Sequence, residues 1–325
     1  MPNVSGTGTT WNLPNYAGEL FTASPTKTPF LSAIGGLSGG LKTESDEFTT
    51  GQLYEFPAAA QPAITETDSE NAPTASALVR SQLNNVTQIF HETIALTYAK
   101  MANRGKLSGL NLAGKQAEPS DELDWQIARR LEKIARDVEY TFINGAYQKS
   151  TAANVANKTR GMLELCAGTG GTTLSALDNS TPTALTLAML KSIYKAMADA
   201  GAQFGKMVMY CNSFQKQKVT SLYESQLGYN KPADRNKGGM NVTRIETDFF
   251  EMDVVYNPFM PTDKILIADI AACAPVFQEV PGKGILFLED LAKTGAADRK
   301  QIYGEIGLDH GPAFLHASIT GLAAS

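Results

Sequence analysis

Residues 161–174, GMLELCAGTGGTTL, hold the pattern in this chain that comes nearest to a cofactor site. Its acidic residue and its glycines are Glu164, Gly168, Gly170 and Gly171. Such a set cradles S-adenosylmethionine when a strand precedes the turn, a helix follows it directly, and an acidic residue closes the next strand about 20 residues on. Here SALDNSTP interrupts the helix early and a helical stretch follows. We interpret the segment as a loop that enters a domain, with an S-adenosylmethionine-binding enzyme as the alternative.

The histidines and cysteines form no metal-binding or nucleophile pattern. His310 and His316 are six residues apart, with Gly311 and Pro312 between them. This spacing fits neither one face of a helix nor one face of a strand. The cysteines lack CxxC spacing and are interpreted as small buried hydrophobic residues: Cys166, Cys211 and Cys273. We expect no hydrolase, zincin or P-loop enzyme, whose patterns are GxSxG, HExxH and GxxxxGK(S/T). We therefore predict no enzyme activity, no cofactor and no metal site.

One long amphipathic helix is predicted at 120–144. Ser120 can cap its start, and Asn144 and Gly145 can end it. Its apolar residues recur at the spacing of one helix face: Leu123, Ile127, Leu131, Ile134, Val138 and Phe142. At 1.5 Å per residue the helix is about 35 Å long. Its charged residues are predicted to form a solvated face: Arg129, Arg130, Glu132, Lys133, Arg136, Asp137 and Glu139.

Two other segments lack enough apolar residues for a core of their own. Residues 46–98 read as a long two-arm β excursion, with FTTGQLYEFP leading out, an acidic TETDSENAP stretch, and LNNVTQIFHETIALTY leading back. Residues 1–45 are a loose arm with isolated apolar clusters around Trp11 and Phe30. Both segments therefore need a surface to lie on, either in their own chain or in a neighbouring copy.

Residues 160–290 alternate helices and strands, which indicates an α/β unit around a sheet. Helices are predicted at 183–200 and 213–226. The predicted strands are 206–211, 241–249, 252–256, 264–268 and 284–288. A basic loop, LGYNKPADRNKGG, is predicted at 227–239.

The composition favours a neutral surface. The 325 residues carry a formal charge of -5, which argues against a protein that coats itself with nucleic acid. Only 19% of residues are charged, below the roughly 25% of soluble domains, and neutral surface is often buried against other subunits. We expect no transmembrane segment and no signal peptide.

Several segments in this order resemble the major capsid proteins of tailed bacteriophages, which have the HK97 fold, and most closely the SU10-like family of them. They are TPFLSAIGG at 28–36, NVTQIF at 85–90, RLEKIARDVEYTFING at 130–145, SFQKQ at 213–217, YNPFM at 256–260 and LAKTGAADRKQI at 291–302. The resemblance implies an α+β capsid fold with an N-terminal arm at 1–45, an extended β loop at 46–90, and an axial α/β domain at 160–287. It further implies a peripheral domain of 91–159 and 288–325 that holds a long spine helix at about 120–144.

The implied function is that of a major capsid protein that self-assembles into hexamers and pentamers of an icosahedral shell around the DNA genome. The implied partners are other copies of the chain, a separate scaffolding protein, a portal and a decoration protein. Double-stranded DNA would be enclosed without sequence-specific binding, and no membrane is involved. The implied location is the virion, after assembly in the cytoplasm of the host bacterium.

The candidate intersubunit contacts are apolar anchors and charged residues. They are Trp11, Phe30, Phe56, Glu66, Asp68, Glu70, Arg80, Lys231, Arg235 and Lys237. We expect the acidic residues of the excursion to face basic residues of an adjacent subunit, such as those of the 227–239 loop.

Two departures bear on mechanism. No lysine lies between Lys42 and Lys100, so the lysine cross-link of the family's founding member is not expected. The 45 residues before the excursion leave no room for a fused scaffolding domain of about 100 residues. A decoration or tail component of a phage is a further structural alternative.

Overall fold

The computed structural model describes residues 22, 24–98, 122–168, 176–226, 243–293 and 295–324. The long helix α4, Glu122–Asn144, follows the apolar spacing of its sequence. Ile134, Val138 and Phe142 are buried, and Leu123, Ile127 and Leu131 pack partly buried at the edge of the same core. The predicted helix is thus confirmed over its described residues. The predicted solvated charged face needs one correction, because Glu139 is fully buried.

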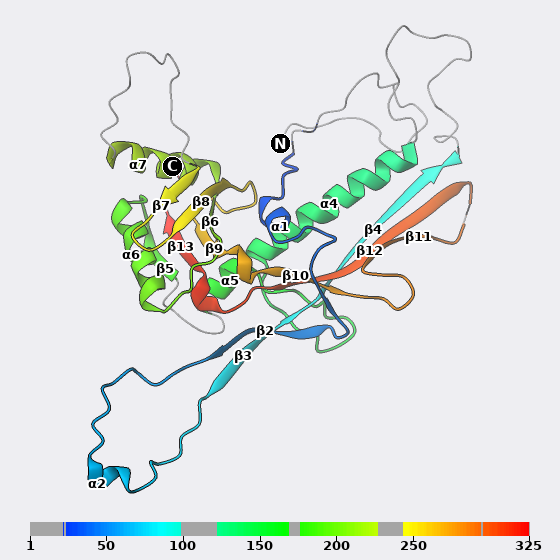
Figure 1. Ribbon diagram of the computed structural model, residues 1–325. Coiled ribbons are helices and arrows are strands. Elements are labelled where there is room, and N and C mark those ends of the chain that lie inside the picture. The colour runs from blue at the N-terminus through cyan, green and yellow to red at the C-terminus, as the bar shows by residue number, and fades with distance from the viewer. Residues whose placement is uncertain are drawn as a thin grey trace.

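A five-stranded sheet lies beside α4. Its central strand β12, Ala297–Asp309, pairs along one edge with β4, Gln88–Thr97. Along its other edge β12 pairs with β11, Leu286–Asp290, and with β10, Ala274–Gln278, which in turn pairs with the short β1, Leu41–Thr43. Figure 1 shows α4 running along β4 and β12.

A six-stranded sheet forms the second half of the body. Its order is β5-β13-β9-β6-β8-β7. The strands are β5 (Ala176–Thr183), β6 (Met207–Cys211), β7 (Arg244–Glu246), β8 (Glu251–Tyr256), β9 (Ile265–Asp269) and β13 (Ala317–Leu322). The central strands β6 and β9 are buried on both faces, which explains their continuous apolar sequences.

The two faces of this sheet enter different cores. Val208 and Tyr210 of β6 join the core that contains α4 and the five-stranded sheet. Met207 and Met209 face the other way, into a core covered by helices α6, Leu187–Asp199, and α7, Ser213–Gln226. Because successive side chains of β6 point to opposite faces of the sheet, this strand contributes to both cores and joins the two halves of the body. The short helix α5, Met162–Cys166, packs against α4.

Two segments extend from the body or fold onto it. The hairpin of β2, Glu47–Tyr54, and β3, Arg80–Val86, projects away from both sheets and carries the one-turn helix α2, Glu66–Ser69, at its far end (Figure 1). The short helix α1, Pro29–Ala33, packs against α4. Two 3-10 turns, Ile270–Ala272 and Ala313–Leu315, connect strands.

Several strands escaped sequence prediction. β10 lies within the predicted axial segment 160–287 but belongs to the five-stranded sheet. β13 lies within the predicted peripheral segment 288–325 but belongs to the six-stranded sheet. The chain therefore crosses between the two sheets several times. Periodicity marks a strand but carries no information about its distant pairing partner.

Candidate interaction site: the extended loop and its anchor

The hairpin beyond the body has almost no contact with the rest of its chain. Every residue from Tyr54 to Gln82 is exposed. An isolated two-stranded hairpin is marginal in water, and a segment this exposed buries no apolar surface to offset its ordering. We call residues 54–82 the extended loop.

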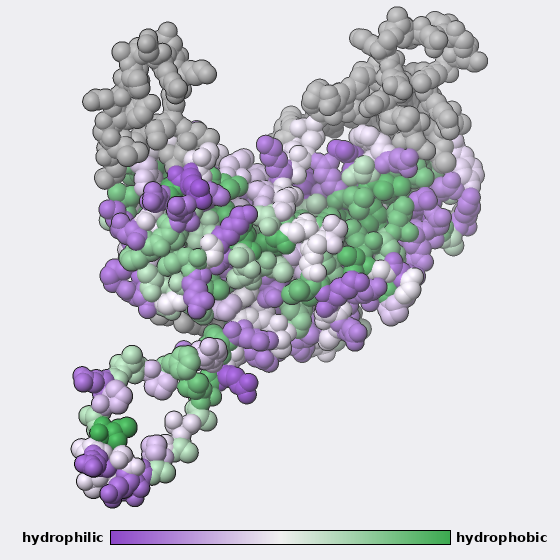
Figure 2. All heavy atoms as spheres, in the orientation of Figure 1, coloured by the Kyte–Doolittle hydropathy of each residue, from purple (hydrophilic) through white to green (hydrophobic). Residues whose placement is uncertain are grey.

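Large hydrophobic side chains are spread along this loop. Phe56 is 71% exposed, Ile64 70% and Val79 78%, and Tyr54 and Leu78 are exposed as well. Tyr54 and Phe56 pack edge to face, with ring centroids 5.4 Å apart. Figure 2 shows the loop projecting from the body with hydrophobic side chains along its two arms. Exposed apolar residues gathered on one segment mark an interaction surface.

The far end of the loop is acidic and locally ordered. Thr65 and Asp68 form a capping box that holds α2: the Thr65 side chain accepts a bond from the Asp68 N–H, and the Asp68 side chain accepts one from the Thr65 N–H. Glu66 and Glu70 flank the capped turn, and no lysine or arginine occurs from Thr43 to Val79. The tip therefore presents an uncompensated negative charge.

A bulge marks the point where the loop leaves the body. The register of the β2–β3 ladder shifts between Thr50 and Leu53. Gly51 has a φ of 59°, a conformation that glycine adopts without strain. Thr50 and Gly51 are buried, whereas Tyr54 and the residues after it are exposed. Bulges bend a strand, so this one sets the direction in which the loop points.

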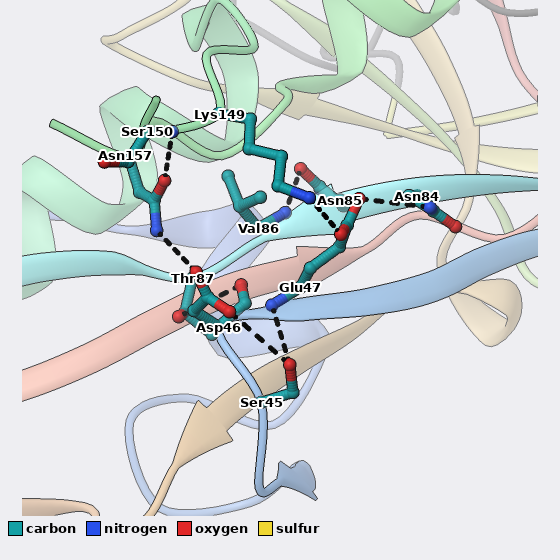
Figure 3. Close-up of polar contacts among 10 residues, drawn as sticks. All are labelled: Ser45, Asp46, Glu47, Asn84, Asn85, Val86, Thr87, Lys149, Ser150 and Asn157. Atoms are coloured by element: carbon teal, nitrogen blue, oxygen red, sulfur yellow. Dashed lines mark hydrogen bonds and ion pairs between the residues drawn. The ribbon is translucent and has the colours of Figure 1, made fainter. Parts of the chain in front are cut away.

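Polar side chains fix the base of the hairpin to the connector that follows α4. Glu47 accepts bonds from Lys149 and from the Asn84 side chain, the latter at 3.1 Å (Figure 3). The hydrogen bond from Lys149, and then that from Asn84, hold the pKa of Glu47 below its ordinary value. Asp46 accepts a bond from Asn157 at 3.4 Å, and its carbonyl accepts the Thr87 N–H at 2.8 Å.

Asn85 is the buried centre of this anchor. Its carbonyl oxygen accepts the N–H groups of Val86 at 2.9 Å and Arg160 at 2.8 Å. Its amide nitrogen donates to the carbonyl of Leu308 at 2.7 Å. One fully buried side chain thus joins the base of the loop, the connector and β12. Its amide is satisfied on both sides, which makes the base rigid while the loop beyond it is free.

The structure places the predicted contact residues in three different settings. Phe56, Glu66, Asp68, Glu70 and Arg80 are exposed on the extended loop. Trp11, Lys231, Arg235 and Lys237 lie outside the described residues. Phe30 needs correction: it is fully buried, with its ring 5.4 Å from that of Tyr210, and has no surface for a neighbouring subunit.

The segment that resembles an S-adenosylmethionine site does not have the structure that such a site requires. Residues 162–166, where the motif needs a strand, form helix α5, and the strand β5 follows at Ala176–Thr183. Gly170 and Gly171 lie outside the described residues. A match to the hydrolase pattern GxSxG, Gly36–Gly40, lies in turns between α1 and β1 rather than between a strand and a helix. Sequence inspection had missed this match.

The cysteines and two of the histidines are structural. The three thiols are buried, and burial raises the pKa of Cys166 to about 12. His316 is buried and lies between the two sheets, where Nδ1 accepts the Asp269 N–H at 3.2 Å and Nε2 contacts the carbonyl of His310 at 2.6 Å. Burial lowers the pKa of His316 to about 4 and lowers that of His310. Among the described residues no cluster of metal-ligating side chains occurs.

The chain is similar in sequence to one protein family and in structure to several shells. A family model described as SU10 major capsid protein matches residues 3–323. No curated protein matches the sequence. The capsid subunit of cyanophage A-1(L) superposes with a TM-score of 0.66 at 11% identity, covering 96% of this chain and 97% of that one.

Two further capsids show the same fold. The capsid of a native GTA particle gives a TM-score of 0.64 at 14% identity, covering 97% of this chain and 96% of that one. Mycobacterium phage Bobi gives 0.56 at 12% identity, covering 95% of each chain. The described architecture is thus the HK97-like capsid fold. The chain belongs to the SU10 major capsid protein family and is the major capsid protein of a tailed bacteriophage.

Proposed function

We propose that the extended loop is the element by which one subunit holds a neighbouring subunit in the hexamers and pentamers of the shell. The observation that carries this proposal is the exposure of every residue from Tyr54 to Gln82 on a hairpin whose base is fixed. A rigid base with an uncovered arm is suited to reach a partner without losing its direction. The ordering cost of the loop would then be offset at the interface rather than within the chain.

Apolar anchors supply most of the contact energy in this proposal. Burying a side chain such as Phe56 contributes about 1.5–3 kcal/mol. An exposed ion pair contributes under about 1 kcal/mol. Repeated over many neighbours, several moderate contacts give a stable shell, while each contact alone is weak enough to reverse during assembly.

The acidic tip adds orientation. Glu66, Asp68 and Glu70 would face basic residues of the adjacent subunit, for which Lys231, Arg235 and Lys237 are the candidates. Attraction of this kind steers approach and disfavours wrong placements more than it adds affinity. The absence of lysine from Thr43 to Ala99 supports a shell held by non-covalent contacts.

The remaining partners follow from this role. Assembly would take place in the host cytoplasm with a separate scaffolding protein, a portal would occupy one vertex, and a decoration protein would bind the finished shell. Packaged double-stranded DNA would be enclosed without sequence-specific binding, since a net charge of -5 does not favour a grip on phosphate. The division into a peripheral and an axial domain would correspond to the five-stranded and six-stranded sheets, and α4 would be the spine helix. No described helix is long and apolar enough to cross a bilayer.

The decisive experiment removes the loop and keeps its anchor. Residues 56–78 are replaced by a short glycine–serine linker, and the variant and the natural chain are each produced with and without the scaffolding protein. Electron microscopy and sedimentation should show shells or capsomers for the natural chain and folded monomers for the variant. Shells of normal size and yield from the loopless variant would exclude the loop as the holding element.

A further inference from the structure

Glu139 is a buried carboxylate that no charged partner neutralises within the described residues. It lies on α4 with none of its surface exposed. No described lysine, arginine or histidine forms an ion pair with it. A buried carboxyl group costs several kcal/mol unless hydrogen bonds replace its water. The partners of Glu139 are therefore the reason it is tolerated.

Two of these partners belong to the N-terminal helix α1. The backbone N–H of Phe30 donates to Oε1 at 3.0 Å, and that of Leu31 donates to Oε2 at 2.6 Å. The first N–H groups of a helix have no partner within the helix, and Thr28, the residue before α1, supplies no side-chain cap. Glu139 thus caps a helix more than a hundred residues away in sequence.

The third partner belongs to the loop that joins β8 to β9. The side-chain amide of Asn257 donates to Oε1 of Glu139 at 2.5 Å. Asn257 is itself fixed, because its N–H donates to the carbonyl of Cys211 at 2.9 Å and its side-chain oxygen accepts the Phe259 N–H at 2.9 Å. Cys211 ends β6 in the six-stranded sheet. One carboxyl group therefore joins the N-terminal helix, the long helix and the six-stranded sheet.

All three partners are donors, so the charge of the carboxylate is shared among them. Burial raises the pKa of Glu139, and the bonds from Leu31, Phe30 and Asn257 lower it. If one donor leaves, the buried charge of Glu139 becomes less well solvated. The hydrogen bonds of the remaining donors then belong to a less stable site, so the segments that carry those donors are held less firmly.

We propose that Glu139 couples the docking of the N-terminal helix α1 on α4 to the position of the β8–β9 loop, so that loosening either one loosens the other. The residues N-terminal to α1 lead directly into it. A contact that they make with another subunit would therefore reach the six-stranded sheet through Glu139. Coupling between linked sites is reciprocal and typically changes an equilibrium by a factor of about 5 to 150.

The test perturbs one side of the junction and measures the other. Asn257→Ala removes the donor from the β8–β9 loop without touching α1. Hydrogen–deuterium exchange on the full chain should then be roughly tenfold faster in the peptide that contains the Phe30 and Leu31 amides. Exchange in β9, Ile265–Asp269, reports global unfolding, so the increase in α1 should exceed any increase in β9.

Asn144→Ala is the matched control. Asn144 also lies on α4 and donates to the same loop, at the carbonyl of Phe259 3.0 Å away, but it does not touch Glu139. This variant should loosen the loop at Phe259 but keep the bond from Asn257 to Glu139, so exchange in α1 should stay unchanged. Equal exchange in α1 for Asn257→Ala and the natural chain, or an equal increase with Asn144→Ala, would overturn the coupling.

A second variant tests the carboxylate directly. Glu139→Gln keeps the shape of the side chain but turns one acceptor into a donor that faces N–H groups. Exchange should rise in both α1 and the loop at 256–260. A rise in only one of the two segments would show that Glu139 holds them independently, and the proposal would be lost.

Discussion

The extended loop and the N-terminal helix α1 look alike in sequence and differ completely in structure. Both belong to segments without enough apolar residues for a core of their own, and both were predicted to carry anchors for a neighbouring subunit. Phe56 on the loop is 71% exposed, whereas Phe30 on α1 is fully buried in its own chain. The contrast shows that a segment without its own core has two destinations, and that composition does not choose between them.

The extended loop and α1 differ in whether a polar side chain of the body caps them. α1 is capped by Glu139, a residue of α4. The tip of the extended loop is capped from within, by Thr65 and Asp68, and so requires nothing from the body. A segment that brings its own cap can remain outside, while one that lacks a cap is held where a cap is offered.

The largest expected effect separates the two phenylalanines. Phe30→Ala empties a fully buried site and should lower the free energy of unfolding of the unassembled subunit by about 3–5 kcal/mol. Phe56→Ala should change it by no more than about 0.5 kcal/mol and should instead reduce shell yield. Urea denaturation and sedimentation measure the two quantities. Equal destabilisation by both substitutions would mean that the loop packs on its own subunit.

The next effect concerns acid and the body alone. The folded chain keeps His316 neutral down to about pH 4, while the unfolded chain binds a proton below about pH 6.5. Stability is therefore present above pH 6.5 and lost as the pH falls toward 4, by on the order of 3 kcal/mol. Buried His310, whose pKa is also lowered, acts in the same direction.

Urea midpoints measured from pH 7.5 to 4.5 would reveal this loss. His316→Asn should make the curve shallower, since only His310 of the two buried imidazoles then remains to be protonated. The matched control, His91→Asn, makes the same substitution at an exposed histidine of β4 and shows the effect of the change outside the core. An unchanged slope in His316→Asn would assign the acid sensitivity to other groups.

The anchor of the loop should give an intermediate effect. Asn85→Ala leaves the N–H groups of Val86 and Arg160 and the carbonyl of Leu308 without their partner, at a cost of about 1–3 kcal/mol in unfolding free energy. Asn84→Ala removes only an exposed bond to Glu47 and should cost less. Limited proteolysis of the loop base would follow the same order. If both variants behave alike, the buried amide is not the centre of the anchor.

The smallest effect belongs to the acidic tip. Glu66→Lys reverses one exposed charge and should change assembly by less than about 1 kcal/mol per contact, with shells still formed at physiological salt. The assembly rate at low salt should fall more than the yield, because steering is lost first. Complete loss of shells would mean that the tip enters a desolvated interface.

Sequence reasoning succeeded where the signal is local. The spacing of Ile134, Val138 and Phe142 predicted α4, and the apolar runs at 206–211 and 264–268 predicted β6 and β9. It failed for β12. The ADRKQIYGEIGLD sequence of this strand mixes charges and glycines, and the strand is held in its sheet by hydrogen bonds to β4, β10 and β11. Such pairing is non-local and leaves no periodic trace.

The polar parts of the site were also beyond sequence reasoning. Glu139 was placed among the solvated charges of its helix, although it follows the apolar Val138 and lies three residues before Phe142 on the buried side. That position was the available signal. Two of the partners of Asn85 are 75 and 223 residues away along the chain, so its role could not be inferred without the fold.

The bulge at Gly51 has a consequence for closure. A closed shell places identical chains at sites of differing curvature, so the angle between neighbours cannot be the same everywhere. The ladder breaks register beside Gly51, between the fixed base and the exposed loop, so the loop can change its angle there while the anchor below it stays fixed. We expect the chain to accommodate differences in curvature by changing the angle of the extended loop at Gly51.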